Sequence, residues 1–173
     1  MEPSTIKVRI AEFQIGRMPA LLKSYGLGSC VGVAIYDPEA RVGGLAHVLL
    51  PAWHKGKGKS AAAPPKNPLK YADLALAELR NRLLAEGCRA DRLLAKIAGG
   101  ANMFSALIPN PSGGPIKPAI GDRNVSAVKT ELKRLGIPIR AEDVGGEEGR
   151  TVELDTQTGA LRVTTSRGGS RVL

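Results

Sequence analysis

Aromatic residues, cysteines and histidines are scarce in this chain of 173 residues. Phe, Trp and Tyr together make up 3% of it, and there are only two Cys and two His. No C-x-x-C or H-x-x-x-H spacing occurs, so we expect no zinc site. Two cysteines are too few for a domain held together by disulfides. The few aromatic residues do not alternate with the Lys/Arg clusters, which argues against a stacking platform for nucleic acid.

Long apolar runs are also missing. None approaches the roughly 20 residues that a membrane helix needs, and residues 1–13 lack the apolar segment of a signal peptide. We therefore expect a cytoplasmic protein, not inserted in a membrane, in which Cys30 remains a free thiol. The net charge of +9 predicts an acidic partner. An acidic protein surface fits that charge as well as nucleic acid does.

The hydrophobic pattern predicts a single α/β domain with a mixed sheet and two main helices. The domain is expected over residues 1–165, followed by a frayed tail at 166–173. Two helices are expected at 69–86 and 123–135, because apolar residues recur there at helical spacing and a glycine follows each. The Lys-, Gly- and Pro-rich segment 54–68 is predicted to be a flexible basic loop, a lid or docking arm if it has a role. Strands are expected at 6–10, 20–23, 30–36, 41–51, 93–98, 138–144, 151–154 and 161–165, with a turn at 24–29 and an irregular loop at 110–118.

Two of these strands predict a hairpin that brings a thiol beside an imidazole. If residues 37–40 form the loop, Cys30 lies directly opposite His47, with their Cβ atoms ~5 Å apart. A thiol beside an imidazole is the arrangement from which proteins generate a thiolate nucleophile at neutral pH. Alternation along the strand places Val31, Val33 and Ile35 on the core face. Small residues share the face of Cys30, which predicts open space beside the sulfur.

A purely structural role for Cys30 and His47 remains an alternative, since a lone Cys on an apolar strand is also a common core residue. Cys88 directly follows a helix stop and is expected to be structural. Three other functions stay open on the residues alone. They are a different thiol hydrolase such as a protease or transglutaminase-like enzyme, a non-enzymatic adaptor, and a nucleic-acid-binding protein.

Six blocks of sequence, in order, carry a family resemblance. They are GLGSCVGVAIYD (26–37), GGLAHVLLP (43–51), KYADLAL (70–76), KIAGGANMF (96–104), IGDRNV (120–125) and AEDVGGEEGRTV (141–152). The ordered set resembles the CheD family, the chemoreceptor glutamine deamidases of bacterial and archaeal chemotaxis.

The resemblance implies an α/β sandwich similar to the catalytic domain of the cytotoxic necrotizing factor toxins. The family's catalytic cysteine lies in the GSC motif and matches Cys30. Its histidine lies in the H-x-x-L-P motif and matches His47. The third catalytic residue of the family is a Thr six positions before the Cys, and Ser24 stands there in this chain.

The implied reaction is attack of Cys30 on the side-chain amide of a protein glutamine, with His47 moving protons. Backbone N–H groups around Gly28 and Ser29 are expected to bind the oxyanion. No metal or organic cofactor is expected. The implied substrate is the cytoplasmic domain of a methyl-accepting chemoreceptor. A CheC-type phosphatase is a second implied partner, with Met103 and Phe104 as candidate contacts.

Overall fold

The computed structural model describes residues 1–53, 65–103 and 118–173, which form two five-stranded sheets and two α-helices. One sheet, here called the central sheet, has the strand order β2-β5-β4-β6-β7. The other, the outer sheet, has the order β1-β3-β8-β9-β10. The central strands are β2 (Phe13–Arg17), β4 (Val31–Asp37), β5 (Val42–Val48), β6 (Leu94–Gly99) and β7 (Ile139–Val144). The outer strands are β1 (Ser4–Lys7), β3 (Ala20–Leu27), β8 (Arg150–Asp155), β9 (Leu161–Thr165) and β10 (Ser170–Val172).

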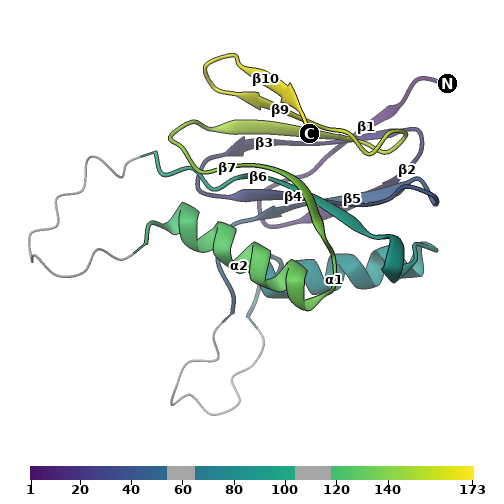
Figure 1. Cartoon of the computed structure of the whole chain (residues 1–173), viewed down its shortest axis with the longest axis horizontal. Helices are drawn as coiled ribbons and strands as arrows, with labels where there is room; N and C mark the ends of the chain where they lie inside the picture. The colour runs from purple at the N-terminus through teal and green to yellow at the C-terminus, as the bar shows by residue number, and fades with distance from the viewer. Residues whose placement is uncertain (54–64, 104–117) are drawn as a thin grey trace, which may run out of the picture.

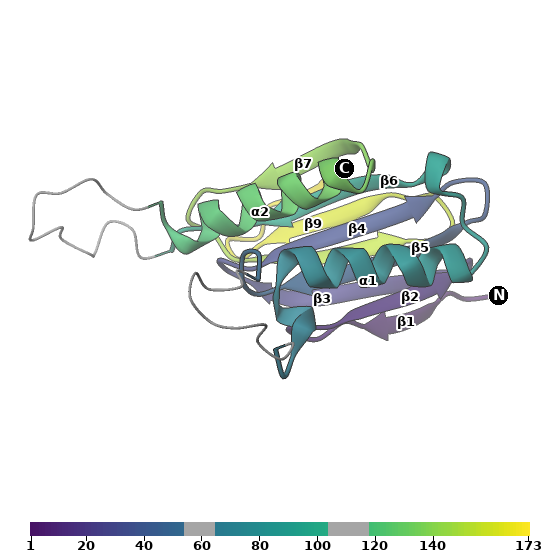
Figure 2. The same cartoon turned by 90° about the horizontal axis from the view of Figure 1, so that it is seen from below.

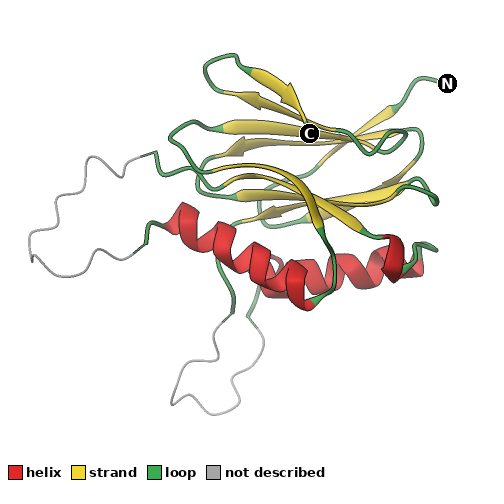
Figure 3. Ribbon diagram, viewed as in Figure 1, coloured by secondary structure: helices red, strands yellow, loops and turns green. Residues whose placement is uncertain are grey.

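The molecule has three layers, which Figures 1 and 3 show from the side. The helices α1 (Ala72–Ala85) and α2 (Ile120–Arg134) cover one face of the central sheet, and the outer sheet covers its other face. Figure 2, a view from below, shows both helices lying over the face of the central sheet. Two short 3-10 helices, η1 (Pro68–Lys70) and η2 (Ala90–Arg92), flank α1. Neither α-helix in the described ranges is long and apolar enough to span a membrane.

Two hydrophobic cores result from this layering. The helix core, between the helices and the central sheet, includes Val33, Leu76 and Leu132, each fully buried. The sheet core, between the two sheets, includes Leu45 and Leu154, which are also fully buried. The central sheet is therefore buried on both faces, and every residue of β4 and β5 is buried.

The predicted α/β class with two helices is confirmed, but the single sheet of the prediction is wrong, since there are two mixed sheets. Strand β2 was not anticipated. The expected turn at 24–29 is also wrong in part, because β3 continues to Leu27 through a bulge after Ser24. Gly26 allows this bulge by adopting a φ of +68°. The predicted loop segments 54–64 and 110–117 lie outside the described residues.

The C-terminal segment is not frayed as the sequence predicted. Residues 170–172 form β10, which pairs antiparallel with β9. Leu173 exchanges two backbone hydrogen bonds with Leu161. The segment contains Gly and Ser and has exposed side chains, so its hydrophobic pattern is weak. Backbone pairing, which the pattern does not reveal, holds it in place.

The β4–β5 hairpin forms, but the predicted register is wrong by two residues. Its loop is 38–41 instead of 37–40, so Asp37 pairs with Val42 and Gly32 pairs with His47. Asp37 is fully buried and its Oδ1 accepts the N–H groups of Glu39 and Ala40. These contacts keep Asp37 at the end of β4, so the turn begins one residue later than predicted.

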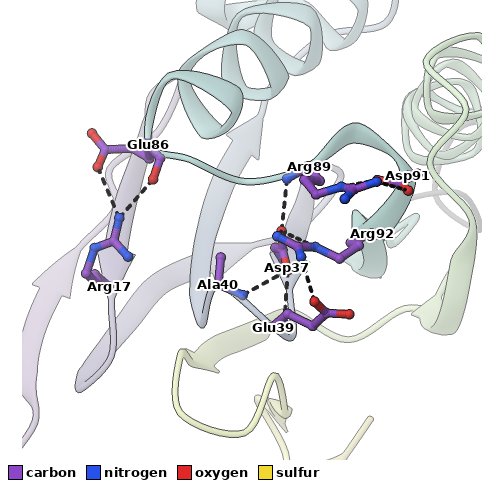
Figure 4. A network of polar contacts seen from close by, with 8 residues as sticks. All are labelled: Arg17, Asp37, Glu39, Ala40, Glu86, Arg89, Asp91 and Arg92. Carbon is purple, nitrogen blue, oxygen red and sulfur yellow. Dashed lines mark hydrogen bonds and ion pairs between the residues drawn. The ribbon is translucent and has the colours of Figure 1, made fainter.

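A polar network extends this anchor toward η2, as Figure 4 shows. Asp37 Oδ2 accepts hydrogen bonds from Arg89 N–H at 3.0 Å and from Arg92 Nε at 3.1 Å. Burial acts to raise the pKa of Asp37. The hydrogen bonds from Ala40, Arg89, Glu39 and Arg92 outweigh burial and lower that pKa. The ionised carboxylate therefore holds the hairpin end to the segment that precedes β6.

Candidate active site

Ser24 and His47 are in contact between the two sheets, and Cys30 lies two residues before Gly32, the residue that pairs with His47. Cys30 directly precedes β4, and His47 lies in β5 of the central sheet, while Ser24 lies in β3 of the outer sheet. Cys30 belongs to the sheet core, and His47 shares a strand face with the sheet-core residue Leu45. The two-residue error in register leaves Cys30 diagonal to His47 instead of directly opposite. A shift of two preserves the face, so both side chains still point into the same layer.

The open space predicted beside the sulfur is not present at Gly32. A Cβ at that position would lie 3.0 Å from Leu27 Cδ1 and 3.1 Å from Val152 Cγ2, both from the outer sheet. The glycine therefore lets the second sheet approach closely. As a result Cys30 is 7% exposed and His47 is 1% exposed.

The hydrogen bonds of Ser24 define which nitrogen of His47 carries its proton. Ser24 Oγ lies 2.8 Å from the carbonyl oxygen of Val8 and 2.8 Å from His47 Nδ1. The carbonyl can only accept, so the single hydroxyl proton is donated to Val8. Ser24 Oγ must then accept from His47 Nδ1–H. In neutral His47 the lone pair therefore lies on Nε2, which is buried and has no hydrogen-bond partner within residues 1–53, 65–103 and 118–173.

Burial favours the neutral forms of both the thiol and the imidazole. It lowers the pKa of His47 from 6.5 to about 4, although the nearby Glu12 acts to raise it. Burial also raises the pKa of the Cys30 thiol, although the residue's own backbone N–H opposes this. The site thus contains a neutral thiol and an imidazole whose basic nitrogen is free to take a proton.

The segment that carries Cys30 is held through its carbonyl groups. The Gly28 carbonyl accepts from Ala101 N–H at 2.8 Å, and the Cys30 carbonyl accepts from Gly100 N–H at 2.8 Å. The Ser29 carbonyl accepts from Asn124 Nδ2 at 2.9 Å. Among the described residues, none accepts a backbone hydrogen bond from the N–H of Ser29, and the Cys30 N–H has only the residue's own thiol as acceptor.

Asn124 on α2 is the residue of this site that sequence reasoning missed. It is fully buried, and its Nδ2 donates to the Ser29 carbonyl and to the Leu49 carbonyl, the latter at 3.1 Å. The sequence held a signal, since Asn124 stands four residues before Val128 and thus on the apolar face of the helix. A polar residue on such a face points to a specific hydrogen-bonding role.

Met103 covers the loop beside the thiol. Its Sδ lies 3.1 Å from the place that a Cβ would occupy at Gly28, and the residue is 48% exposed. Phe104, the other candidate contact, lies outside the described residues. Cys88 is 6% exposed in the helix core, and burial raises its pKa to about 11, in accord with a structural role. Within the described ranges, no three His, Cys, Asp or Glu side chains are grouped to hold a metal ion.

The described residues thus provide a thiol, an imidazole nitrogen without a hydrogen-bond partner among them, and the backbone N–H groups of Ser29 and Cys30, to which no other described residue binds. These are the parts needed for nucleophilic attack on an acyl carbon and for binding of the oxyanion that forms.

Comparison with known families and proteins gives consistent matches. The family model described as CheD chemotactic sensory transduction matches residues 49–165. A protein of Desulfitobacterium hafniense is 44% identical over 170 residues, which cover 98% of this chain and 99% of that relative. A protein of Caldanaerobacter subterraneus subsp. tengcongensis is 42% identical over 173 residues and the full length of both chains. Each relative is described as a probable chemoreceptor glutamine deamidase CheD. The family-model match begins after His47, whereas the full-length relatives span all three residues of the site.

Proposed function

Because this chain belongs to the CheD family of chemotaxis proteins, we propose that it converts glutamine side chains of chemoreceptors to glutamate. Cys30 is the nucleophile, His47 transfers protons, and Ser24 orients His47. The observation that carries this assignment is the hydrogen-bond pair at Ser24, because it leaves the basic Nε2 of His47 without a partner.

In the first half of the reaction, the Cys30 sulfur attacks the carboxamide carbon and its proton passes to His47 Nε2. Proton transfer accompanies attack, because burial disfavours a preformed thiolate and imidazolium pair. The tetrahedral oxyanion accepts hydrogen bonds from the N–H groups of Ser29 and Cys30. The C–N bond then breaks, and the imidazolium gives its proton to the departing ammonia.

In the second half, neutral His47 removes a proton from water, and the resulting hydroxide attacks the thioester carbon. The C–S bond breaks, the Cys30 sulfur takes the proton back, and the product is glutamate. The reaction consumes one water and releases one ammonia, and no step in it requires a metal or an organic cofactor.

The substrate proposed is a glutamine on the cytoplasmic helical stalk of a methyl-accepting chemoreceptor, which places the enzyme in the cytoplasm. A CheC-type phosphatase is proposed as a second partner. Met103 is a suitable contact for either, since it is half exposed and lies over Gly28 in the Cys30 loop. The likeness to the cytotoxic necrotizing factor catalytic domain stays a prediction.

The first test is mass spectrometry of a chemoreceptor cytoplasmic fragment incubated with wild-type protein and with Cys30→Ala. We expect a gain of about 1 Da at defined glutamines with the wild type alone, because amide is replaced by acid only when the thiol is present. Loss of His47 should lower the rate by at least the ~10²–10⁴ that general acid–base catalysis supplies.

Other outcomes would point elsewhere. Chain cleavage or cross-linking instead of the mass gain would indicate a protease or transglutaminase-like enzyme. If no fragment changes mass and Cys30 reacts slowly and unselectively with iodoacetamide, the protein is an adaptor. Cys88→Ala is the matched control, since that cysteine is buried in the other core and should leave deamidation unchanged.

A further inference from the structure

The backbone carbonyl groups of Gly28, Ser29 and Cys30 each accept a hydrogen bond, but the donors differ in kind. Gly28 and Cys30 are held by backbone N–H groups of residues 101 and 100. Ser29, between them, is held by the side chain of Asn124. The Ser29 carbonyl is thus the one of the three whose hydrogen bond comes from a side chain.

The direction of a carbonyl fixes the direction of the N–H in the same peptide unit. In a trans peptide the two groups point in opposite directions across a planar unit. The Ser29 carbonyl and the Cys30 N–H belong to one such unit. Because Asn124 holds that carbonyl toward α2, the Cys30 N–H points away from the helix, and no described residue other than Cys30 itself, through its thiol, accepts a hydrogen bond from it.

Asn124 also connects this loop to the strand that carries the base. Its second amide proton is donated to the carbonyl of Leu49, two residues beyond His47. Both donors must face these two carbonyls, since a rotated amide would place Oδ1 against two other oxygens. The amide orientation is therefore fixed by its partners.

The remaining atom of the Asn124 amide shows that the residue is not placed for stability alone. Oδ1 is buried and has no hydrogen-bond partner among the residues that the structure describes, which is unfavourable for a polar atom. Asparagine is also a poor residue for the interior of a helix. An apolar residue would avoid both costs, but it would leave the loop and the strand end without their donor.

We propose that Asn124 is the positioning residue of the oxyanion site: it holds the Ser29–Cys30 peptide so that the Cys30 N–H faces the reacting carbonyl. This role rests on the proposed deamidase function and deepens it. Asn124 acts through the peptide and does not touch the substrate. Loss of Asn124 should therefore slow a reaction in which an oxyanion forms. It should leave unchanged a reaction of the Cys30 thiol in which no oxyanion forms.

Two variants test the role, Asn124→Leu, which conserves volume, and Asn124→Ala. For each, kcat and KM for glutamine deamidation are compared with the rate at which iodoacetamide alkylates Cys30. Alkylation displaces iodide without forming an oxyanion. We expect kcat to fall about 10²–10³-fold, as when one oxyanion donor is lost, with KM and the alkylation rate little changed. Lys129→Ala is the control, because it alters an exposed ion pair on the same helix.

An unchanged kcat would overturn the proposal, and so would an equal loss of kcat and alkylation rate, which would indicate collapse of the whole site. If Asn124→Ala does not fold, Asn124→Leu carries the comparison. A crystal structure of Asn124→Leu separates this proposal from the function itself. If wild-type protein shows no deamidation, the proposed function fails, while a Ser29–Cys30 peptide turned in the variant still supports the positioning role. A peptide that keeps its orientation rejects that role whatever the activity.

Discussion

Ser24 has one hydroxyl proton, and the protonation pattern of the site depends on where that proton goes. The Val8 carbonyl takes it, so His47 must donate to Ser24 through Nδ1. The resemblance to the CheD family implies a Thr at this position. Either residue supplies the one hydroxyl that the pattern needs. In Ser24 the rotamer is held by these two hydrogen bonds and by complete burial, in place of the stiffening methyl group of Thr.

The lowered pKa of His47 leads to a prediction about pH. The folded value of about 4 lies below the ordinary value of 6.5, so the unfolded chain binds the proton first as pH falls. Stability from this residue is therefore complete above pH 6.5 and decreases as pH falls toward 4. The loss reaches up to about 3 kcal/mol, from 1.36 kcal/mol for each pKa unit. Urea unfolding at several pH values measures it.

The control for this prediction is His47→Gln, whose stability should lack this part of the pH dependence. NMR titration gives the pKa directly, and the imidazole signal that disappears in the variant identifies His47 among the two histidines of the chain. A His47 pKa near 6.5 in the folded protein would contradict the buried, neutral base described above.

The sequence allowed the common strand face of Cys30 and His47 to be predicted, but the prediction of their direct opposition was wrong. Hairpin periodicity is two, so an error of two residues in the register kept both side chains on one face. Ser24 entered through the family resemblance. Asn124 was missed, because its partners are backbone carbonyls far away in the chain, and local pattern does not report such contacts.

At the scale of elements, β4 depends on the absence of a side chain at Gly32. The Gly32→Ala variant would bring a methyl group to 3.0 Å from Leu27 and 3.1 Å from Val152. Such overpacking costs about 1–3 kcal/mol. We expect lower stability in chemical denaturation together with reduced deamidation, because Gly32 pairs directly with His47.

Gly149→Ala is the matched control for this substitution. A Cβ there meets nothing closer than the Leu27 carbonyl oxygen at 3.8 Å, so its free energy of unfolding should change little. Equal effects of the two substitutions would show that the approach of the outer sheet does not set the cost, because the effect of Gly→Ala on the unfolded chain alone favours folding.

The helices were easier to predict than the strands, for physical reasons. Both helices have repeated apolar positions and a glycine after the last turn, and all of this information is local. Strand β2 has half-buried residues on both faces, and β10 is three exposed residues long. Their existence depends on the backbone of β5 and β9, which no local pattern contains.

At the scale of the whole molecule, the net charge of +9 predicts salt-dependent capture of the substrate. This charge predicts an acidic surface on the proposed receptor substrate, and attraction between oppositely charged surfaces is screened as ionic strength rises. We expect kcat/KM on a receptor fragment to fall as NaCl increases, with kcat nearly constant. Steady-state kinetics at several salt concentrations measures both.

Alkylation of Cys30 by iodoacetamide, a neutral reagent, provides the control, and its rate should not depend on salt. If the two rates fall in parallel, salt acts on the site and not on encounter with the receptor. A kcat/KM that is independent of salt would remove the role proposed for the basic charge.

The α/β class was predictable from composition and patterning, whereas the division into two sheets was not. A strand buried on both faces, such as β4, has almost the same pattern whether its second face meets a helix or another sheet. Whether a helix or a second sheet packs on that face depends on contacts between distant residues. One example is the contact of Gly32 with Val152, which lies 120 positions later in the chain.

The three chemical groups of the site are all synthesised within the first 47 residues, but the parts that complete it come much later. The Gly100 and Ala101 amides, then Asn124, and finally the outer-sheet residue Val152 emerge from the ribosome in that order. A nascent chain that ends before α2 has the proposed nucleophile and base but lacks Asn124, the residue proposed to orient the Cys30 N–H. If the proposed function holds, deamidase activity is acquired late in translation, and an incomplete polypeptide exposes the thiol without the groups that would make it catalytic.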